Sequence, residues 1–570
     1  MSLTGRDLAS TAAGAHPVDQ GTLPEGDADS LRRQLESELP AYGEWLHSAA
    51  ADEFLVRVRQ GQLTRLTTFL ARRAFRLVTV VGNDERELED RCFKIYYVFD
   101  HRRSPLVISA EYSLARNSSD YTSIRRDHPA AEPFERELFD MLGLRPRGRP
   151  ASPRGLLHDR YPRGLHPLRR DPLGPDAAER VRAHLQAHAA PERHPMRQPR
   201  SSGPARAGVV LPVGPIHAGV IEPGLFRFHV DSEAIEDVDI ELGFTHRGIE
   251  RIFQTHMHLL DGWRLAEQVS GDSSAAHALA YCRAAEALTE GDPPAAAELV
   301  RVVLLELERI GNHVLDVATL AQDVALEQPA AGIFVIREEL QQLHRRVTGH
   351  RFLRGAIRPG GVHLPRPFDV DDLRRTLEAQ LRRFADSAHS IVARAGFRSR
   401  TIGVGVLTAQ EAYDLGATGL VARASTPPPE QREPDESRAG DVYARCLTRI
   451  AEVAQSHRRI DALLDAWPSV APRSASALRT RLRVRPENNY TFALGRADGF
   501  RGEIVYWIMQ DKLNGIYRCK ITDPSTVNWP ALRRCLLPRT LPDGRMLETV
   551  LGDFPLVNKS FNLSYSGNDL

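Results

Sequence analysis

The stretch AAAELVRVVLLELERIGNHVLDVATLAQDVA, residues 295–325, decides the fold of this chain. Its apolar residues recur at helical spacing over a wide face, which predicts a long helix that neighbouring helices cover on most sides. Such a helix is typical of a bundle. Further helical runs are predicted at 250–290, 332–348, 370–395 and 440–466. Short strands precede these runs and two strands follow them, so residues 207–570 are expected to form a large helical-bundle domain with flanking β-sheet.

The first part of the chain has a different pattern. Residues 1–28 are small and polar, which predicts a disordered tail. Residues 29–171 combine helical patterns with strands such as FRLVTVVG and CFKIYYVFD, which predicts a small α+β module. Residues 172–206 are rich in Pro, Arg, Ala and His and are interpreted as a linker with one short helix. The expected fold class is therefore α+β, with an exposed loop at 425–437.

Composition excludes several classes of protein. The 75 basic residues nearly balance the 74 acidic ones among 570 residues, so no nucleic-acid partner is expected. The five cysteines lie far apart and form no CxxC pair, which suits reduced thiols inside a cell. There is no apolar signal region and no run near the roughly 20 apolar residues of a spanning helix. Membrane association is therefore expected to come through partner subunits.

Two sets of motifs follow one another along the chain. FERELFDMLGL and YPRGLHPLRRD, between residues 134 and 171, resemble the small hydrophilic subunit of complex I. The second set resembles the large subunit of energy-converting nickel–iron hydrogenases and its homologue, the quinone-proximal subunit of complex I. It consists of GPIHAGVIEPGLFRFHVD (214–231), HRGIERI (246–252), LELERIGNH (305–313), RFLRGAIRPGGV (351–362), GATGLVARAS (416–425), GDVYARCLTRI (440–450) and RGEIVYWI (501–508). Both modules in one chain resemble the large subunit of formate hydrogenlyase and related hydrogenase-4-type complexes.

The resemblance implies four metal-binding thiolates that this chain lacks. In the hydrogenases, two CxxC pairs hold the nickel–iron centre. The segment that matches the first pair, VSGDSSAAHALAY, has Ser270 and Ser273 at the cysteine positions, and NLSYSGND has Ser564 and Gly567 at those of the second pair. A serine hydroxyl is hard and stays protonated, and glycine has no side chain, whereas soft thiolates select this metal centre. No metal and no cofactor of its own is expected for this chain.

The quinone contacts implied by the complex I resemblance are also incomplete. The loop that carries two histidines in the family keeps only the first, His217. The tyrosine expected on the opposite side of the quinone falls near Gly271. A quinone, or another small molecule, would have to bind without its usual headgroup ligands.

Glu250 and His217 each have two interpretations. Glu250 matches a glutamate associated with proton transfer in the hydrogenases, but a carboxylate at a helix start is also favoured by the helix dipole. His217 could bind a ligand or shuttle a proton, or it could fix its own loop.

Asp272 lies between the two lost cysteines, with His277 about one helical turn further on. With Ser270 and Ser273 it could relay protons or bind a hard cation. Alternatively, Asp272 or Ser270 caps the following helix. Both roles are compatible.

Arg501 matches the arginine of a PRG loop near the active centre, although phenylalanine replaces the proline. The basic stretch 145–170 is interpreted as a contact with neighbouring subunits rather than with nucleic acid. The predicted catalytic residues are Glu250, Asp272, His277 and Arg501, and the predicted cofactor-binding residues are His217, Ser270 and Ser273.

The function that the resemblance implies is that of a large subunit in a membrane-associated hydrogenase-like or NADH:quinone oxidoreductase-like complex. It would couple electron transfer from a small iron–sulfur subunit to ion translocation by antiporter-like membrane subunits. It would lie on the cytoplasmic face of the inner membrane. The alternative is a catalytically silent structural core of such a complex.

Overall fold

The computed structural model describes residues 25–47, 52–116, 118–147, 155–157, 161–162, 164–170, 174–187, 208–217, 221–425, 439–472, 474–485, 489–541 and 544–570. Residues 1–24 of the predicted tail, 426–437 of the predicted loop, and 172–173 and 188–206 of the predicted linker lie outside them. Helix α2 (Glu25–Glu38) begins within the predicted tail, and α5 (Gly174–Ala187) lies where the linker's short helix is predicted.

The N-terminal module is a mixed five-stranded sheet in the order β1-β2-β5-β4-β3. Strands β2 and β5 are parallel, and the other neighbours are antiparallel. Helix α3 packs on the sheet through Leu63, Leu66 and Leu70 because these residues recur every three or four positions. The elements are β1 (Gly43–His47), β2 (Glu53–Val58), α3 (Leu63–Arg72), β3 (Phe75–Glu85), β4 (Cys92–His101), β5 (Val107–Ser113) and α4 (Glu132–Leu142).

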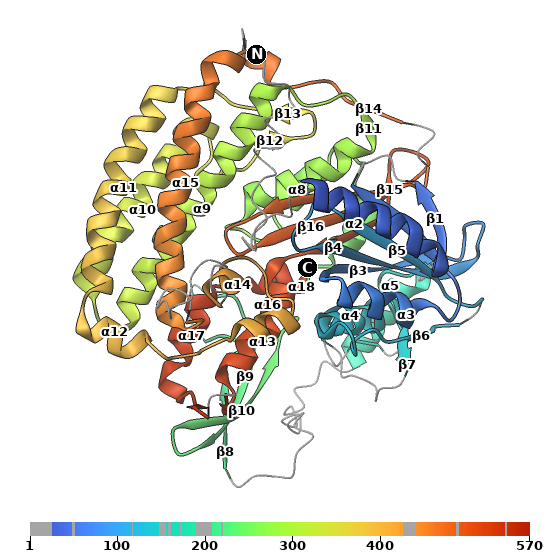
Figure 1. Ribbon diagram of the computed structural model, residues 1–570, viewed down its shortest axis with the longest axis horizontal. Helices are drawn as coiled ribbons and strands as arrows, with labels where there is room; N and C mark the ends of the chain where they lie inside the picture. Colours follow the sequence, from blue (N-terminus) through green and yellow to red (C-terminus); the bar gives the residue numbers. More distant parts are fainter. Residues whose placement is uncertain are drawn as a thin grey trace.

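The predicted bundle is present. Helix α9 is buried on nearly all sides from Ala296 to Ala321, as its wide apolar face predicts. Figure 1 shows the four long helices side by side, on the side of the molecule away from the N-terminal sheet. They are α9 (Ala295–Asp323), α10 (Glu327–Thr348), α11 (Val370–Val392) and α15 (Val442–Val470). The α+β fold class is confirmed.

One predicted helix is wrong. The run at 250–290 is divided into α6 (Ile249–His256), α7 (Trp263–Ala266) and α8 (Ser274–Ala287). The first helix ends at Met257, whose extended backbone (φ −107°, ψ 140°) does not continue it. Helices α6 and α8 lie within the predicted run, and the segment between them packs along α8, where the Tyr281 hydroxyl donates to the Leu259 carbonyl at 2.8 Å.

A second sheet joins the two parts of the chain. It contains β15 (Phe492–Asp498), β16 (Glu503–Gln510) and β17 (Ile516–Thr522), all antiparallel. Trp507 is fully buried and packs against Tyr96 of β4, with ring centroids 4.9 Å apart. Arg76 of β3 binds Glu503 of β16 at 2.7 Å. In Figure 1 this sheet lies between the bundle and the N-terminal sheet.

The remaining elements surround the end of the chain. A three-stranded antiparallel sheet, β10-β9-β8, lies beside the C-terminal helices. These elements are β8 (Val209–Val213), β9 (Leu225–Asp231), β10 (Ala234–Glu241), α16 (Pro524–Leu536), α17 (Phe554–Phe561) and α18 (Tyr565–Asp569). No helix among the described residues is both long and apolar enough to cross a bilayer.

Candidate functional site

The two segments that lack cysteines meet in the folded chain. The hydroxyl of Ser270, in the turn before α8, is hydrogen-bonded to that of Ser564, with the two Oγ atoms 2.9 Å apart, although the residues are 294 positions apart. Ser273 is the N-cap residue of α8, and Gly567 lies within α18. The four positions that hold cysteines in the hydrogenases therefore lie close together next to the bundle, as the resemblance implies.

Other protein groups occupy the space around the four positions that hold cysteines in the hydrogenases. A Cβ built at Gly567 would lie 2.6 Å from Cγ of the buried Asp523, so no side chain fits there without movement. The Ser564 hydroxyl accepts from the Gly567 amide at 2.9 Å, and this bond caps α18. The family resemblance implies four thiolates for a nickel–iron centre, and soft thiolate ligands are what select such a metal. The residues present do not fit that group, because three offer protonated hydroxyls and the fourth position has no room. Within the described part of the chain, no three His, Cys, Asp or Glu side chains are grouped to hold a metal.

Arg501 and Asp272 form the centre of the polar network. The guanidinium donates two bonds to the carboxylate, from Nη1 to Oδ1 at 2.6 Å and from Nη2 to Oδ2 at 2.7 Å. Ser270 Oγ donates to Asp272 Oδ1 at 3.1 Å, and Arg501 Nη1 also donates to Ser273 Oγ at 3.1 Å. Burial alone would raise the pKa of Asp272, but the charge of Arg501 outweighs it and holds that pKa below its ordinary value.

The turn that presents Arg501 keeps its shape without proline. Gly499 and Gly502 exchange two backbone hydrogen bonds, at 2.9 and 3.1 Å. Gly502 has a φ of +144°, which a side chain rarely adopts, and an added Cβ would lie 2.8 Å from Thr418. The guanidinium of Arg501 also lies 4.4 Å from the Phe500 ring centroid. Two glycines and a stacking contact therefore fix this loop.

His277 lies on α8, the helix that follows Asp272 and Ser273, and its partners are not those of Asp272. Its Nε2 is 3.2 Å from Asp523 Oδ2 and its Nδ1 is 3.0 Å from the Tyr506 hydroxyl. Burial raises the pKa of Tyr506 well above its ordinary value, so the phenol stays protonated. Burial also acts to raise the pKa of Asp523, but the hydrogen bond from His277 and the charge of Arg501 lower it. A neutral imidazole that donates from Nε2 and accepts at Nδ1 satisfies all three groups.

The expectation that Asp272 or Ser270 caps α8 is wrong. The N-cap residue Ser273 makes no side-chain cap bond. The free amides of Ala275 and Ala276 instead donate to Glu308 of α9, at 2.6 and 3.1 Å. The carboxyl group of Glu308, from the bundle, thus takes the role that a local side chain was expected to fill, while Asp272 lies one residue before the N-cap and binds Arg501.

Glu308 and Glu267 are buried carboxyls with raised pKa values. Burial raises the pKa of Glu308 to about 8, against the lowering effect of the two α8 amides. Burial raises the pKa of Glu267 to about 7, while the Gly355 amide, which donates to it at 2.7 Å, lowers it. Both groups titrate near neutral pH and lie beside the segment that carries Ser270, Asp272 and Ser273.

Glu250 belongs to a separate cluster. Its Oε2 accepts from Arg518 at 2.6 Å, and its Oε1 lies 3.4 Å from Lys520. Lys520 also binds Glu137 of the N-terminal module at 2.5 Å. Burial would raise the pKa of Glu250, but the two cations hold it below its ordinary value. These contacts tie α6 to β17 and to α4, and none of them involves the predicted catalytic partners of Glu250.

His217 lies at the edge of the site. Its Nδ1 is 3.3 Å from its own loop's Pro215 carbonyl, and its Nε2 is 3.5 Å from the hydroxyl of Tyr565, the neighbour of Ser564. Its ring also packs edge-on against Phe226. These contacts match the interpretation of a histidine that fixes its loop, and they leave its ligand role a prediction.

Sequence reasoning missed Asp523, Tyr506, Glu267 and Glu308. Asp523 has a local signal, since an aspartate before Pro524 marks a helix start, and it caps α16 through the Ser525 amide at 2.7 Å. That signal says nothing of His277, which is 246 residues away. Glu308 lies within a quoted motif, but only the packing of α8 on α9 reveals its partners.

The close approach at Gly567 predicts a stability effect. Gly567→Ala should lower the free energy of unfolding by about 1–3 kcal/mol, because its Cβ would overlap the Asp523 carboxylate. Urea unfolding measures the effect, and Gly552→Ala is the matched control, since nothing lies within 4 Å of a Cβ there. Equal stability of the two variants would contradict the packing described.

The raised pKa of Glu308 predicts a pH dependence of stability. The folded pKa is about 8, above the ordinary value of about 4.3, so the folded state holds the proton more tightly. Stability from this group is therefore present at low pH and falls as the pH rises towards 8, by up to about 1.4 kcal/mol per unit. Glu308→Gln should make that fall smaller, measured by urea unfolding between pH 5.5 and 8, while the part that comes from the raised pKa of Glu267 remains. The control Glu378→Gln, at a largely exposed carboxylate, should keep the full fall in stability. If stability falls as much in Glu308→Gln as in the unmodified chain, the raised pKa of Glu308 is refuted.

Comparison with known proteins agrees with this arrangement. Residues 323–491 match the family model for the respiratory-chain NADH dehydrogenase 49 Kd subunit, and residues 56–176 match that for the 30 Kd subunit. The chain is 29% identical to formate hydrogenlyase subunit 5 of Escherichia coli, over 91% of this chain and 89% of the relative. It is 30% identical to hydrogenase-4 component G of the same organism, over 86% of this chain and 83% of the relative.

A third relative is shorter. An NADH-quinone oxidoreductase subunit of Ehrlichia chaffeensis is 26% identical over 61% of this chain and 96% of its own length. Two modules that are typical of complex I thus follow each other in one polypeptide, and the two longer relatives match over nearly all of it. The chain belongs to the family of hydrogenase-4-type large subunits, in which 30 Kd-like and 49 Kd-like complex I modules are fused.

Proposed function

We propose that this chain is the core subunit of a membrane-associated oxidoreductase complex that works without a nickel–iron centre. In this role it couples electron transfer from an iron–sulfur partner to ion movement in membrane partners. The observation that carries the proposal is the meeting of Ser270, Ser273, Ser564 and Gly567 at one place, where an Arg501–Asp272 ion pair and Asp523 take up the space.

The residues at this place can hold and move protons. His277 is hydrogen-bonded on both sides, to Asp523 and to Tyr506, so a proton gained at one ring nitrogen can be released at the other. Glu308 and Glu267 change protonation near neutral pH, beside the start of α8. Arg501 keeps its positive charge and would stabilise a negative charge that arrives nearby. This chemistry belongs to the chain itself and needs no bound metal.

The relatives support the partners in this proposal. They are components of formate hydrogenlyase, of hydrogenase-4 and of NADH-quinone oxidoreductase. We infer a small iron–sulfur subunit and antiporter-like membrane subunits as neighbours, with this chain attached peripherally on the cytoplasmic side. A quinone would be the acceptor, with His217 and Tyr565 as the polar groups at the edge of the site.

A structural role is the second candidate. The hydrogen bonds and ion pairs of Asp272, Arg501 and Asp523 are satisfied within the chain, which is also how a site that has lost its reaction would look. Such a chain would hold ion-translocating subunits in place without receiving electrons.

Purification of the native complex through this chain separates the two candidates. The proposal predicts an iron–sulfur subunit in stoichiometric amount, with paramagnetic iron–sulfur signals after reduction with dithionite. It also predicts that Arg501→Met, which leaves Asp272 without its cation, slows quinone reduction by the complex while that subunit stays bound. A complex with no iron–sulfur subunit would rule the proposal out in favour of the structural role.

A further inference from the structure

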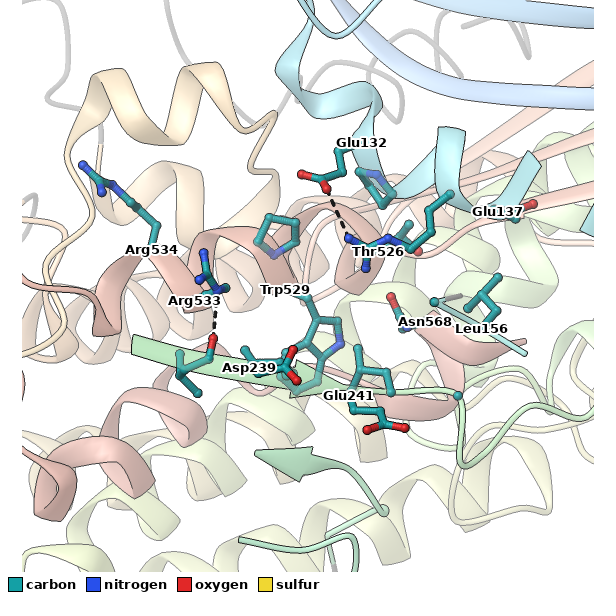
Figure 2. A pocket seen from close by; sticks show the side chains of 18 of the residues that line it. Glu132, Glu137, Leu156, Asp239, Glu241, Thr526, Trp529, Arg533, Arg534 and Asn568 are labelled. Atoms are coloured by element: carbon teal, nitrogen blue, oxygen red, sulfur yellow. Dashed lines mark hydrogen bonds and ion pairs between the residues drawn. The ribbon is translucent and has the colours of Figure 1, made fainter. Parts of the chain in front are cut away.

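A cavity of about 570 Å³ lies between α4 of the N-terminal module and β10, α16 and α18 of the large one. Figure 2 shows Trp529 in the middle of this view, with Glu132 of α4 on one side and Asp239 of β10 on the other. Glu132 binds Arg136 at 3.1 Å, and Asp239 binds Arg227 at 2.9 Å. Such internal pairs give the cavity no distinct ligand chemistry, whereas the exposed turn after β16 has a distinct reactivity.

The turn between β16 and β17 has the sequence DKLNG, residues 511–515. Its middle residues, Lys512, Leu513 and Asn514, are exposed, and Leu513 is 85% exposed. Asn514 has a φ of +60°, in the left-handed region that asparagine tolerates better than most residues. Asparagine followed by glycine is a frequent pair in hairpin turns for this reason. The turn thus holds an asparagine in water directly before a glycine.

The fold holds neither of the two groups that can react in this pair. Within the described part of the chain, the side-chain amide of Asn514 and the backbone amide of Gly515 form no hydrogen bond. Glycine carries no Cβ beside its backbone nitrogen, so this nitrogen is less hindered than that of other residues. Its attack on Cγ of the preceding asparagine closes a five-membered ring.

The backbone does not require glycine at position 515. The φ angle of Gly515 lies outside the left-handed region, and the nearest atom to an added Cβ would be Cβ of Asp511 at 3.5 Å, an ordinary contact. Alanine therefore fits at this position without strain. A difference in reactivity between glycine and alanine here would come from access to the nitrogen and not from a change of fold.

We propose that Asn514 is a site of spontaneous deamidation. The Gly515 nitrogen forms a bond to Cγ of Asn514 and loses its proton, while the bond from Cγ to Nδ2 breaks and ammonia leaves. Water then opens the resulting succinimide. If water breaks the new bond to Cγ, an aspartate results, and if it breaks the original peptide bond, the chain continues through Cγ as isoaspartate. Only water is consumed, and the modification does not depend on the proposed function.

The isoaspartate product would change a contact of the segment between α6 and α8. The Asn514 carbonyl accepts from the Leu259 amide at 2.9 Å, and the Leu259 carbonyl accepts from the Tyr281 hydroxyl of α8 at 2.8 Å. In isoaspartate the carbonyl of residue 514 becomes part of a free carboxylate, and the main chain gains one carbon. The segment 257–262 would therefore lose part of its attachment to the turn. The aspartate product keeps this carbonyl and only adds a charge.

Ageing of the purified full-length chain tests the site. Incubation at mildly alkaline pH, followed by peptide mapping with mass spectrometry, should show conversion of the Asn514 amide to the acid. An isoaspartyl methyltransferase should methylate the same peptide. Asn489 is the internal control, because it is also exposed but precedes the bulky Tyr490, and it should stay an amide. No conversion of Asn514, or equal conversion of Asn489, would overturn the inference.

Two variants separate the chemistry from the fold. Gly515→Ala should slow the conversion severalfold, and Asn514→Gly, which suits the φ of +60°, should abolish it. Hydrogen exchange of residues 257–262 should be faster in the aged chain than in the fresh one, and it should not change on ageing of Asn514→Gly. Conversion of Gly515→Ala at the rate of the unmodified chain would overturn the proposed attack. Unchanged exchange after conversion to isoaspartate would overturn its effect on the segment.

Discussion

The ion pair between Arg501 and Asp272 is the interaction on which the candidate site depends. Each partner comes from a turn that the rest of the fold fixes, one between β15 and β16 and the other before α8. Arg501 is almost fully buried, so loss of the carboxylate would leave its charge without a partner. Beside the pair, the amides of Ala275 and Ala276 at the start of α8 donate to Glu308 of α9.

The contacts between the two segments that carry cysteines in the hydrogenases relate this chain to its family. A metal site of four thiolates holds two distant segments together by coordination. Here hydrogen bonds perform that task, with Ser270 on Ser564 and the Ser564 amide on Ser525 Oγ, both at 2.9 Å. Asp523 takes up the remaining space beside Gly567. A chain of the hydrogenase-4-type family thus joins these two segments through groups whose donor atoms do not suit nickel.

Much of the fold can be predicted from the sequence, because it rests on local periodicity. Helix α9, strands β3 and β4, and strands β16 and β17 lie where their apolar patterns indicate. The run at 250–290 resembles one helix because it carries no proline. The possible cap at Asp272 or Ser270 already indicates a helix start within it, but the extended backbone of Met257, where α6 ends, has no such local signal.

The candidate site can be predicted in part, through motifs rather than periodicity. Asp272, Ser273 and Arg501 do come together, as do Ser270 and Ser564. Glu250 contacts other residues, and the partners of His277 are 229 and 246 positions away. Buried partners such as Asp523 and Glu308 depend on how helices and strands pack, so a single sequence does not reveal them.

The amount of nickel per copy of this chain, measured by elemental analysis of the purified native complex, tests the central claim most directly. The account predicts no nickel above the background of a preparation from cells grown without added nickel, because hydroxyls and a filled glycine position replace the thiolates. A stoichiometric amount of nickel would contradict it, and would mean that the Arg501–Asp272 network opens to bind a metal through other groups.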